Sequence, residues 1–160
     1  MNLMALGIAV LALVAADEDQ PPPPVSIRVV AVQASDDQEG EPKKQALRFG
    51  SGTEEIRTAI GDLKFDNYKL VKASTVTAQF NQESRVPIDN TYTLYLQPLS
   101  RESGGRVKLN VRVTMPGKTP QAEPVNALKT TVIAAPGNKF KLRGLELDDG
   151  ELVLVLTVRG

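Results

Sequence analysis

The sequence contains neither histidine nor cysteine among its 160 residues. The first absence removes the commonest general base and the commonest metal ligand, and the second removes thiol nucleophiles, zinc-binding thiolates and disulfides. We therefore expect no catalytic, cofactor-binding or metal-binding residues of these kinds. The lack of cysteine does not identify a compartment, because a domain of this length can be stable on its core alone.

An excess of charge of either sign is also missing, since 19 lysine and arginine side chains balance 19 aspartate and glutamate side chains. A protein attracted in bulk to nucleic acid would carry an excess of positive charge, so we expect no nucleic-acid partner. The hydrophobic fraction of 41% and the charged fraction of 24% are typical of one globular domain.

No apolar run has the length of about 20 residues that crosses a bilayer comfortably. Only Asn2 is polar within residues 1–16, and the acidic run Asp17-Glu18-Asp19 follows at once, although no lysine or arginine precedes the apolar stretch. We predict that residues 1–16 are a signal peptide cleaved after Ala16, leaving no stable membrane span. The protein would then be periplasmic or extracellular. The alternative is that this stretch is the first buried element of a cytosolic domain.

Residues 17–24 separate the predicted signal peptide from the rest of the chain. They combine the acidic run with four consecutive prolines at 21–24, which fix an extended polyproline conformation. We interpret this segment as a spacer. The alternative is that the proline tract binds an aromatic groove of another protein. Residues 25–160 then form a single domain.

The pattern of residues 51–63 predicts a helix that spans about residues 52–62. Ser51 and Glu54 have the spacing of a capping box, and Gly61 is expected to end the helix. One apolar stripe, which predicts a helix laid on a sheet, contains Ile56, Ala59, Ile60 and Leu63.

Alternating apolar and polar residues predict strands through most of the remaining chain. The unbroken run at 152–156, after the turn signal Asp149-Gly150, predicts a central strand buried on both faces. Pro87 confines its own strand to a sheet edge. We expect an α+β, mostly β fold, an antiparallel sheet or β-sandwich meander of about seven or eight strands. Nine stretches have a strand pattern, of which about seven or eight are expected as strands of the fold: residues 25–34, 68–73, 75–80, 85–88, 91–98, 107–114, 125–134, 139–143 and 151–159.

Two stretches carry a resemblance to a known class of protein. Residues 63–71, LKFDNYKLV, follow the predicted helix, and the chain ends with Pro136-Gly137, Arg143-Gly144, Asp149-Gly150 and an apolar strand. This arrangement resembles exported β-rich domains of bacterial envelope proteins, and the ending is similar to the closing strands of secretin pore proteins. The resemblance implies an envelope location and a β-rich fold, and it brings no functional residues with it.

No catalytic motif is recognisable in the sequence. The serines lack a Ser-x-x-Lys context, and Gly50-Ser51-Gly52 lacks the Gly-Lys-Ser/Thr ending of a phosphate-binding loop. Asp148 and Asp149 stand at a predicted hairpin apex, where exposed carboxylates are poorly suited to acid–base catalysis. We therefore expect a protein that is not an enzyme.

Two functions remain open. The first is an exported structural or interaction module that docks an envelope protein through a sheet edge or a loop, by strand addition where the edge is free. The alternative is a module that binds an anionic polymer or a lipid head group through a basic sheet face. Whether this face is continuous depends on which strands are neighbours; its residues would be Lys108, Arg112, Lys139, Lys141 and Arg143.

Overall fold

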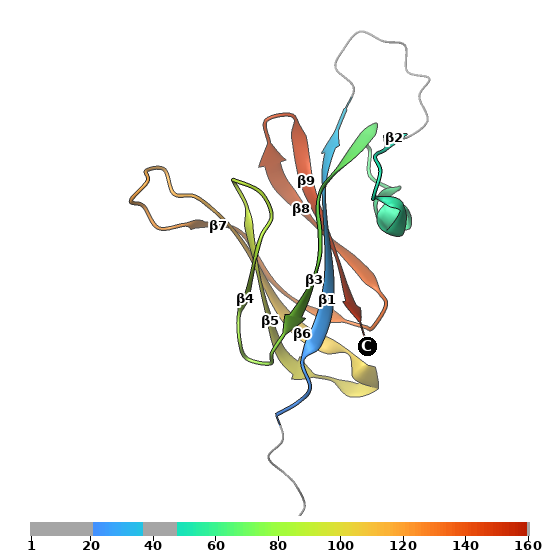
Figure 1. Cartoon of the computed structure of the whole chain (residues 1–160), viewed down its shortest axis with the longest axis vertical. Helices are drawn as coiled ribbons and strands as arrows, with labels where there is room; N and C mark the ends of the chain where they lie inside the picture. Colours follow the sequence, from blue (N-terminus) through green and yellow to red (C-terminus); the bar gives the residue numbers. More distant parts are fainter. Residues whose placement is uncertain (1–20, 37–47, 160) are drawn as a thin grey trace, which may run out of the picture.

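The computed structural model describes residues 21–36 and 48–159, which fold into two sheets packed on a common core (Figure 1). The five-stranded sheet has the strand order β2-β3-β1-β9-β8. Its strands are β1 (Val25–Ser35), β2 (Arg48–Phe49), β3 (Asn67–Ala78), β8 (Lys139–Leu147) and β9 (Gly150–Arg159). The four-stranded sheet has the order β4-β5-β6-β7. Its strands are β4 (Ser84–Pro87), β5 (Thr93–Arg101), β6 (Val107–Met115) and β7 (Val125–Ala134).

Strand pairing in the described residues is antiparallel except between β2 and β3. The predicted α+β, mostly β fold is therefore confirmed. The four-stranded sheet is a meander, whereas the five-stranded sheet is not, because β1 pairs with β3 on one side and with β9 on the other. The predicted signal peptide, residues 1–16, and the acidic part of the spacer, residues 17–20, lie outside the described residues.

The last strand, β9, is buried on both faces, as its unbroken apolar run predicts. It lies between β1 and β8, and its pairing with β1 extends from Ser26 opposite Arg159 to Ala34 opposite Glu151. Alternate side chains of these two strands therefore enter two different cores.

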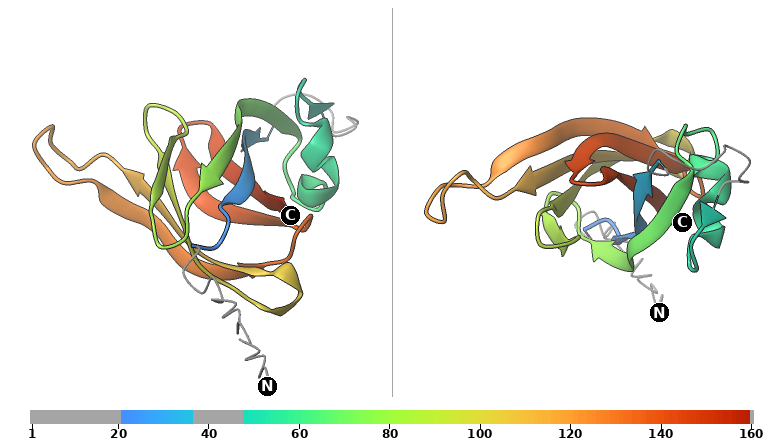
Figure 2. Two further views of the ribbon diagram at one scale, coloured as in Figure 1. Left: turned by 60° about the horizontal axis from the view of Figure 1, so that its bottom comes forward. Right: turned by 90° about the horizontal axis from the view of Figure 1, so that it is seen from above.

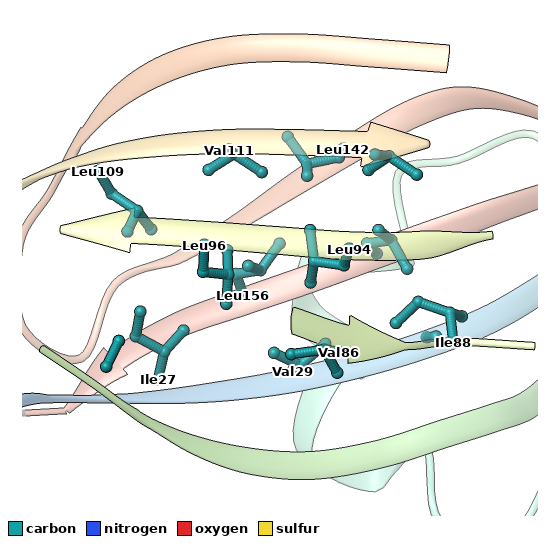
Figure 3. Close-up of a cluster of buried hydrophobic side chains, with 14 of the residues drawn as sticks. Ile27, Val29, Val86, Ile88, Leu94, Leu96, Leu109, Val111, Leu142 and Leu156 are labelled. Carbon is teal, nitrogen blue, oxygen red and sulfur yellow. The ribbon is translucent and has the colours of Figure 1, made fainter. Parts of the chain in front are cut away.

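The larger core fills the space between the two sheets (Figure 3). Ile27 and Val29 reach it from β1 and Leu156 reaches it from β9, while Leu94 and Leu96 come from β5. Burying each of these side chains contributes about 1.5–3 kcal/mol, so this layer supplies much of the stability of the fold.

The smaller core lies on the outer face of the five-stranded sheet, under a short helical segment. This segment consists of one 3-10 turn, η1 (Glu54–Ile56), and one α-helical turn, α1 (Arg57–Ile60). The predicted apolar stripe does cover a sheet. Ile56, Ile60 and Leu63 pack with sheet residues that include Val30, Val32, Val153 and Val155.

The predicted capping box is wrong. The residue at the N-cap of η1 is Thr53, and no side chain caps the turn. Instead, the Thr53 hydroxyl donates a hydrogen bond of 2.7 Å to the Gly50 carbonyl oxygen, while Ser51 lies exposed in the preceding turn. The helical segment is shorter than predicted, because it begins at Glu54 with a 3-10 turn and ends at Ile60. Gly61 is its C-cap, as predicted, and a turn follows.

One predicted boundary between strands is also wrong. The sequence divides residues 68–80 into two strands at Ser74, but β3 runs unbroken through this position, with Ser74 in register with Val29 of β1. A single small polar residue does not interrupt a strand when both of its neighbours keep the ladder. The irregularity lies instead opposite Ala31 and Val32.

Candidate functional site

The edges of the two sheets are the places where an extended partner segment could bind, because an edge strand presents unpaired backbone donors and acceptors. The strand orders leave β4 and β7 at the edges of one sheet, and β8 and the β2–β3 side at the edges of the other. These four edges differ in length, charge and regularity.

The β4 edge is poorly suited to pairing. The strand has four residues, and its last residue, Pro87, has no backbone donor. The Pro87 carbonyl oxygen already accepts a hydrogen bond of 2.5 Å from the Lys72 ammonium of β3. The position of β4 at the end of its sheet confirms the prediction that Pro87 stands in an edge strand. The Lys72 contact joins this edge to β3 of the other sheet, whose first two residues are paired with β2.

The β8 edge is bent and charged. Its pairing with β9 shifts between Leu142 and Leu145, where Gly144 has a φ of +84°. The Lys141 ammonium pairs with the Asp62 carboxylate and donates to the Ala59 carbonyl oxygen at 3.1 Å. Bulges and charges of this kind are how proteins discourage pairing along an edge.

The β7 edge has one of these protections, a shift in its pairing with β6 between Val113 and Thr114 that leaves Ala127 without a register partner. From Leu128 to Ala134 its ladder is regular. The strand contains ten residues, with no proline or glycine and with Lys129 as its single charge. On one side it pairs with β6, and on the other side it is the last strand of its sheet. The loop that joins β6 to β7 projects beyond the rest of the domain (Figure 2).

Exposed hydrophobic side chains occur at both ends of the ladder between β6 and β7. Ile133 is 59% exposed and Val125 is 51% exposed, and Met115, the register partner of Val125 on β6, is 39% exposed. These three are the exposed large hydrophobic residues of the described part of the chain. Leu128 and Val132, which are half-buried, pack from β7 against the main core, so the core itself is open along this edge.

A row of basic and aromatic side chains crosses the outer face of the four-stranded sheet. Arg85 is opposite Tyr95, Tyr95 is opposite Arg112, and Arg112 is opposite Lys129, so all four share one face. The Arg112 guanidinium lies 4.2 Å from the centre of the Tyr95 ring and 2.7 Å from a Glu83 carboxylate oxygen. Stacking and ion pairing hold this arginine in place.

The five basic residues singled out from the sequence do not share one sheet. Lys108 and Arg112 lie on β6 of the four-stranded sheet, whereas Lys139, Lys141 and Arg143 lie on β8 of the other sheet. Arg112, Lys141 and Arg143 are paired with Glu83, Asp62 and Glu151 respectively. Lys108 and Lys139 are exposed.

Two of these ion pairs shift the pKa of a carboxyl group. The hydrogen bond from Lys141 lowers the pKa of Asp62, and the hydrogen bond from Arg143 lowers the pKa of Glu151. Glu151 is the better held of the two, because Arg143 donates through two nitrogens and Gly144 N donates at 2.7 Å. These groups stabilise the bend of β8.

A hollow of about 630 Å³ lies between the loops that join β4 to β5 and β6 to β7. Arg85, Tyr95, Met115 and Lys118 are among the residues that line it. Asp89 is also part of its wall, but its carboxylate accepts hydrogen bonds from Thr91 N and Tyr92 N and so serves the loop. In the described part of the chain, no group of three or more acidic side chains could hold a metal ion.

Ile133 and Lys129 are not among the residues that the sequence singles out. Residues 125–134 are correctly predicted as a strand, but nothing in one sequence tells which strand ends a sheet. One signal was available, because the alternation that places Lys129 and Thr131 on the polar face places Ile133 there too. A single apolar residue on a polar face is common on protein surfaces, so this signal alone does not identify a docking edge.

No family model, curated protein or solved structure matches this chain. The resemblance to exported envelope domains therefore remains a prediction. Across residues 21–36 and 48–159, none of the helical turns has the length and apolar character required to span a membrane.

Proposed function

We propose that this protein is a non-enzymatic interaction module that binds an extended segment of a partner protein as an added strand along β7. One observation carries the proposal. Among the sheet edges described above, β7 alone combines ten residues, an absence of proline and glycine, and exposed hydrophobic side chains.

Strand addition would use both the backbone and the open side of the core. The backbone of the partner segment would complete the hydrogen-bond ladder of β7, which gives affinity, and its alternate side chains would give specificity. Side chains facing the core would cover Leu128 and Val132, which are only half-buried now. The exposed Ile133 would be covered on the opposite face.

We further propose that the protein acts outside the cytoplasm, in the cell envelope, and that its partner is an envelope protein. The support is the apolar stretch at residues 1–16 and the acidic boundary after it.

Binding of an anionic polymer or a lipid head group through the five basic residues has weaker support. Its residues are divided between two sheets, and three of them already have carboxylate partners.

Amide exchange tests the proposal. A capped ten-residue peptide that alternates valine with serine, added to the exported protein, should slow exchange at alternate backbone amides of β7, those that point away from β6. A peptide with N-methyl groups on its β7-facing amides should lose this effect, whereas methylation of the other amides should leave it intact. Protection confined to another strand, or equal binding of both methylated peptides, would contradict strand addition on β7.

A further inference from the structure

The strands of the four-stranded sheet contain five basic residues and no acidic residue. The basic residues are Arg85, Arg101, Lys108, Arg112 and Lys129. Every charged side chain in the strands of this sheet is therefore positive, although the whole sequence has equal numbers of positive and negative side chains.

Four of these cations project from one face. Arg85, Arg112 and Lys129 share the transverse row described above, and Lys108 is four residues from Arg112 on the same strand, which returns it to the same face. This is the outer face, because the intervening residues Leu109 and Val111 enter the main core.

The cations closest to the free edge have no counter-ion among residues 21–36 and 48–159. Glu83 neutralises Arg112, but within the described ranges neither Lys108 nor Lys129 forms an ion pair. Lys108 is the register partner of Ile133, and Lys129 lies on β7 itself. A strand added to β7 would place its own outer side chains directly beside Lys129 and near Lys108.

We propose that the segment accepted by β7 is acidic, with carboxylates on its outward-facing side chains and apolar residues on its core-facing side chains. The aliphatic stem of an outward-facing glutamate would cover Ile133, which shares the outer face with Lys129. This inference rests on the proposed strand addition and adds the chemistry of the partner. The core-facing positions would cover Leu128 and Val132. A carboxylate opposite Lys129 would supply the counter-ion that the sheet itself does not provide.

A second copy of the chain fits this edge less well. β7 contains no aspartate or glutamate, so pairing two β7 strands would bring Lys129 of each copy toward the other without a carboxylate between them. Like charges on neighbouring strands oppose pairing. An acidic segment of a different protein would instead place a carboxylate beside Lys129.

Three capped ten-residue peptides test the inference on the exported protein: one alternates valine with glutamate, one alternates valine with lysine, and one contains glutamate alone. At low salt the valine–glutamate peptide should bind about two- to tenfold more tightly than the valine–lysine peptide, as expected for one or two favourable cross-strand charge pairs. Lys129→Glu should reverse this preference. Lys139→Glu makes the same change on an exposed lysine of β8 and should leave the preference unchanged.

The outcomes separate the inference from the function on which it rests. Equal binding of both alternating peptides, with alternate amides of β7 protected, would overturn the acidic partner and leave strand addition standing. If neither alternating peptide binds, both the acidic partner and strand addition on β7 are rejected. Equally tight binding of the all-glutamate peptide would assign the face to a polyanion instead. A dimer in sedimentation, with β7 amides protected in the absence of peptide, would assign the edge to a second copy.

Discussion

Gly150, at the start of β9, lies directly against the backbone of Ala34 in β1. Its φ is +117°, and a Cβ atom placed on it would be 2.1 Å from the Ala34 carbonyl oxygen. The turn signal Asp149-Gly150 is thus confirmed, and the glycine is needed both for its conformation and for the space it leaves.

We expect Gly150→Ala to lower the free energy of unfolding by at least about 2 kcal/mol, because a positive φ and a backbone clash act together. Gly137→Ala is the matched control. Gly137 also has a positive φ, +79°, but open space surrounds the position of its missing Cβ, so this change should cost about 1–2 kcal/mol. Urea denaturation measures both, and a smaller loss for Gly150→Ala than for Gly137→Ala would contradict the close approach.

Thr53→Val should destabilise the protein by about 1 kcal/mol, because Thr53 is fully buried and its hydroxyl satisfies the Gly50 carbonyl. Ser51→Ala should change stability by less than about 0.5 kcal/mol, since Ser51 is exposed and makes no capping bond. Thermal denaturation of the two variants compares these expectations. A larger loss for Ser51→Ala would restore the capping box.

The ion pair between Glu151 and Arg143 should make stability depend on pH in the acid range. The folded state lowers the pKa of Glu151 below its ordinary value, so the unfolded state binds a proton more readily, and the contribution of the pair is lost as the pH falls from the ordinary pKa through the lowered one. Glu151→Gln should therefore cost up to about 1 kcal/mol at pH 7, because Arg143 is half-exposed, and less at an acid pH below the lowered pKa. Arg143→Gln should give the same pattern in urea melts at the two pH values. A loss that is equal at both would speak against the pair.

Ile133→Thr should separate docking from folding. Because Ile133 is mostly exposed, this change should alter the free energy of unfolding by less than about 0.5 kcal/mol while weakening binding of an alternating peptide. Leu154→Ala, in the fully buried middle of β9, should instead cost about 2–5 kcal/mol. Peptide titration and urea melts of both variants provide the comparison. Unchanged peptide affinity in Ile133→Thr would remove this residue from the docking surface.

The export prediction has a direct measurement. Intact mass of the protein from the envelope fraction should correspond to residues 17–160, because the apolar stretch has the length of a signal peptide and an acidic boundary follows Ala16. Recovery of the full chain from the cytoplasm would refute it.

Local patterns predicted the parts of the fold that depend on local chemistry. The apolar run of β9, the turn at Gly150 and the edge position of Pro87 each follow from one or two adjacent residues. The stripe of Ile56, Ile60 and Leu63 also packs as expected, although the helical segment between Thr53 and Gly61 is only one 3-10 turn and one α-helical turn long.

Pairings between distant strands were not accessible in the same way. Each set of basic residues has its own alternation, and nothing local tells that Lys108 belongs to one sheet and Lys139 to the other. The row from Arg85 through Tyr95 and Arg112 to Lys129 exists only because four strands are in one particular register. A docking edge is likewise a property of strand order, which a single sequence does not encode in any short stretch.

The pairing of the first long strand with the last has a consequence for how the chain folds. β1 and β9 come from opposite ends of the described domain, so their ladder requires closure of a loop that spans nearly the whole chain. Contacts of such high sequence separation form slowly, and the ladder cannot begin before β9 has been synthesised. Until then β1 lacks one of its two neighbours, and the nascent chain has no completed central sheet.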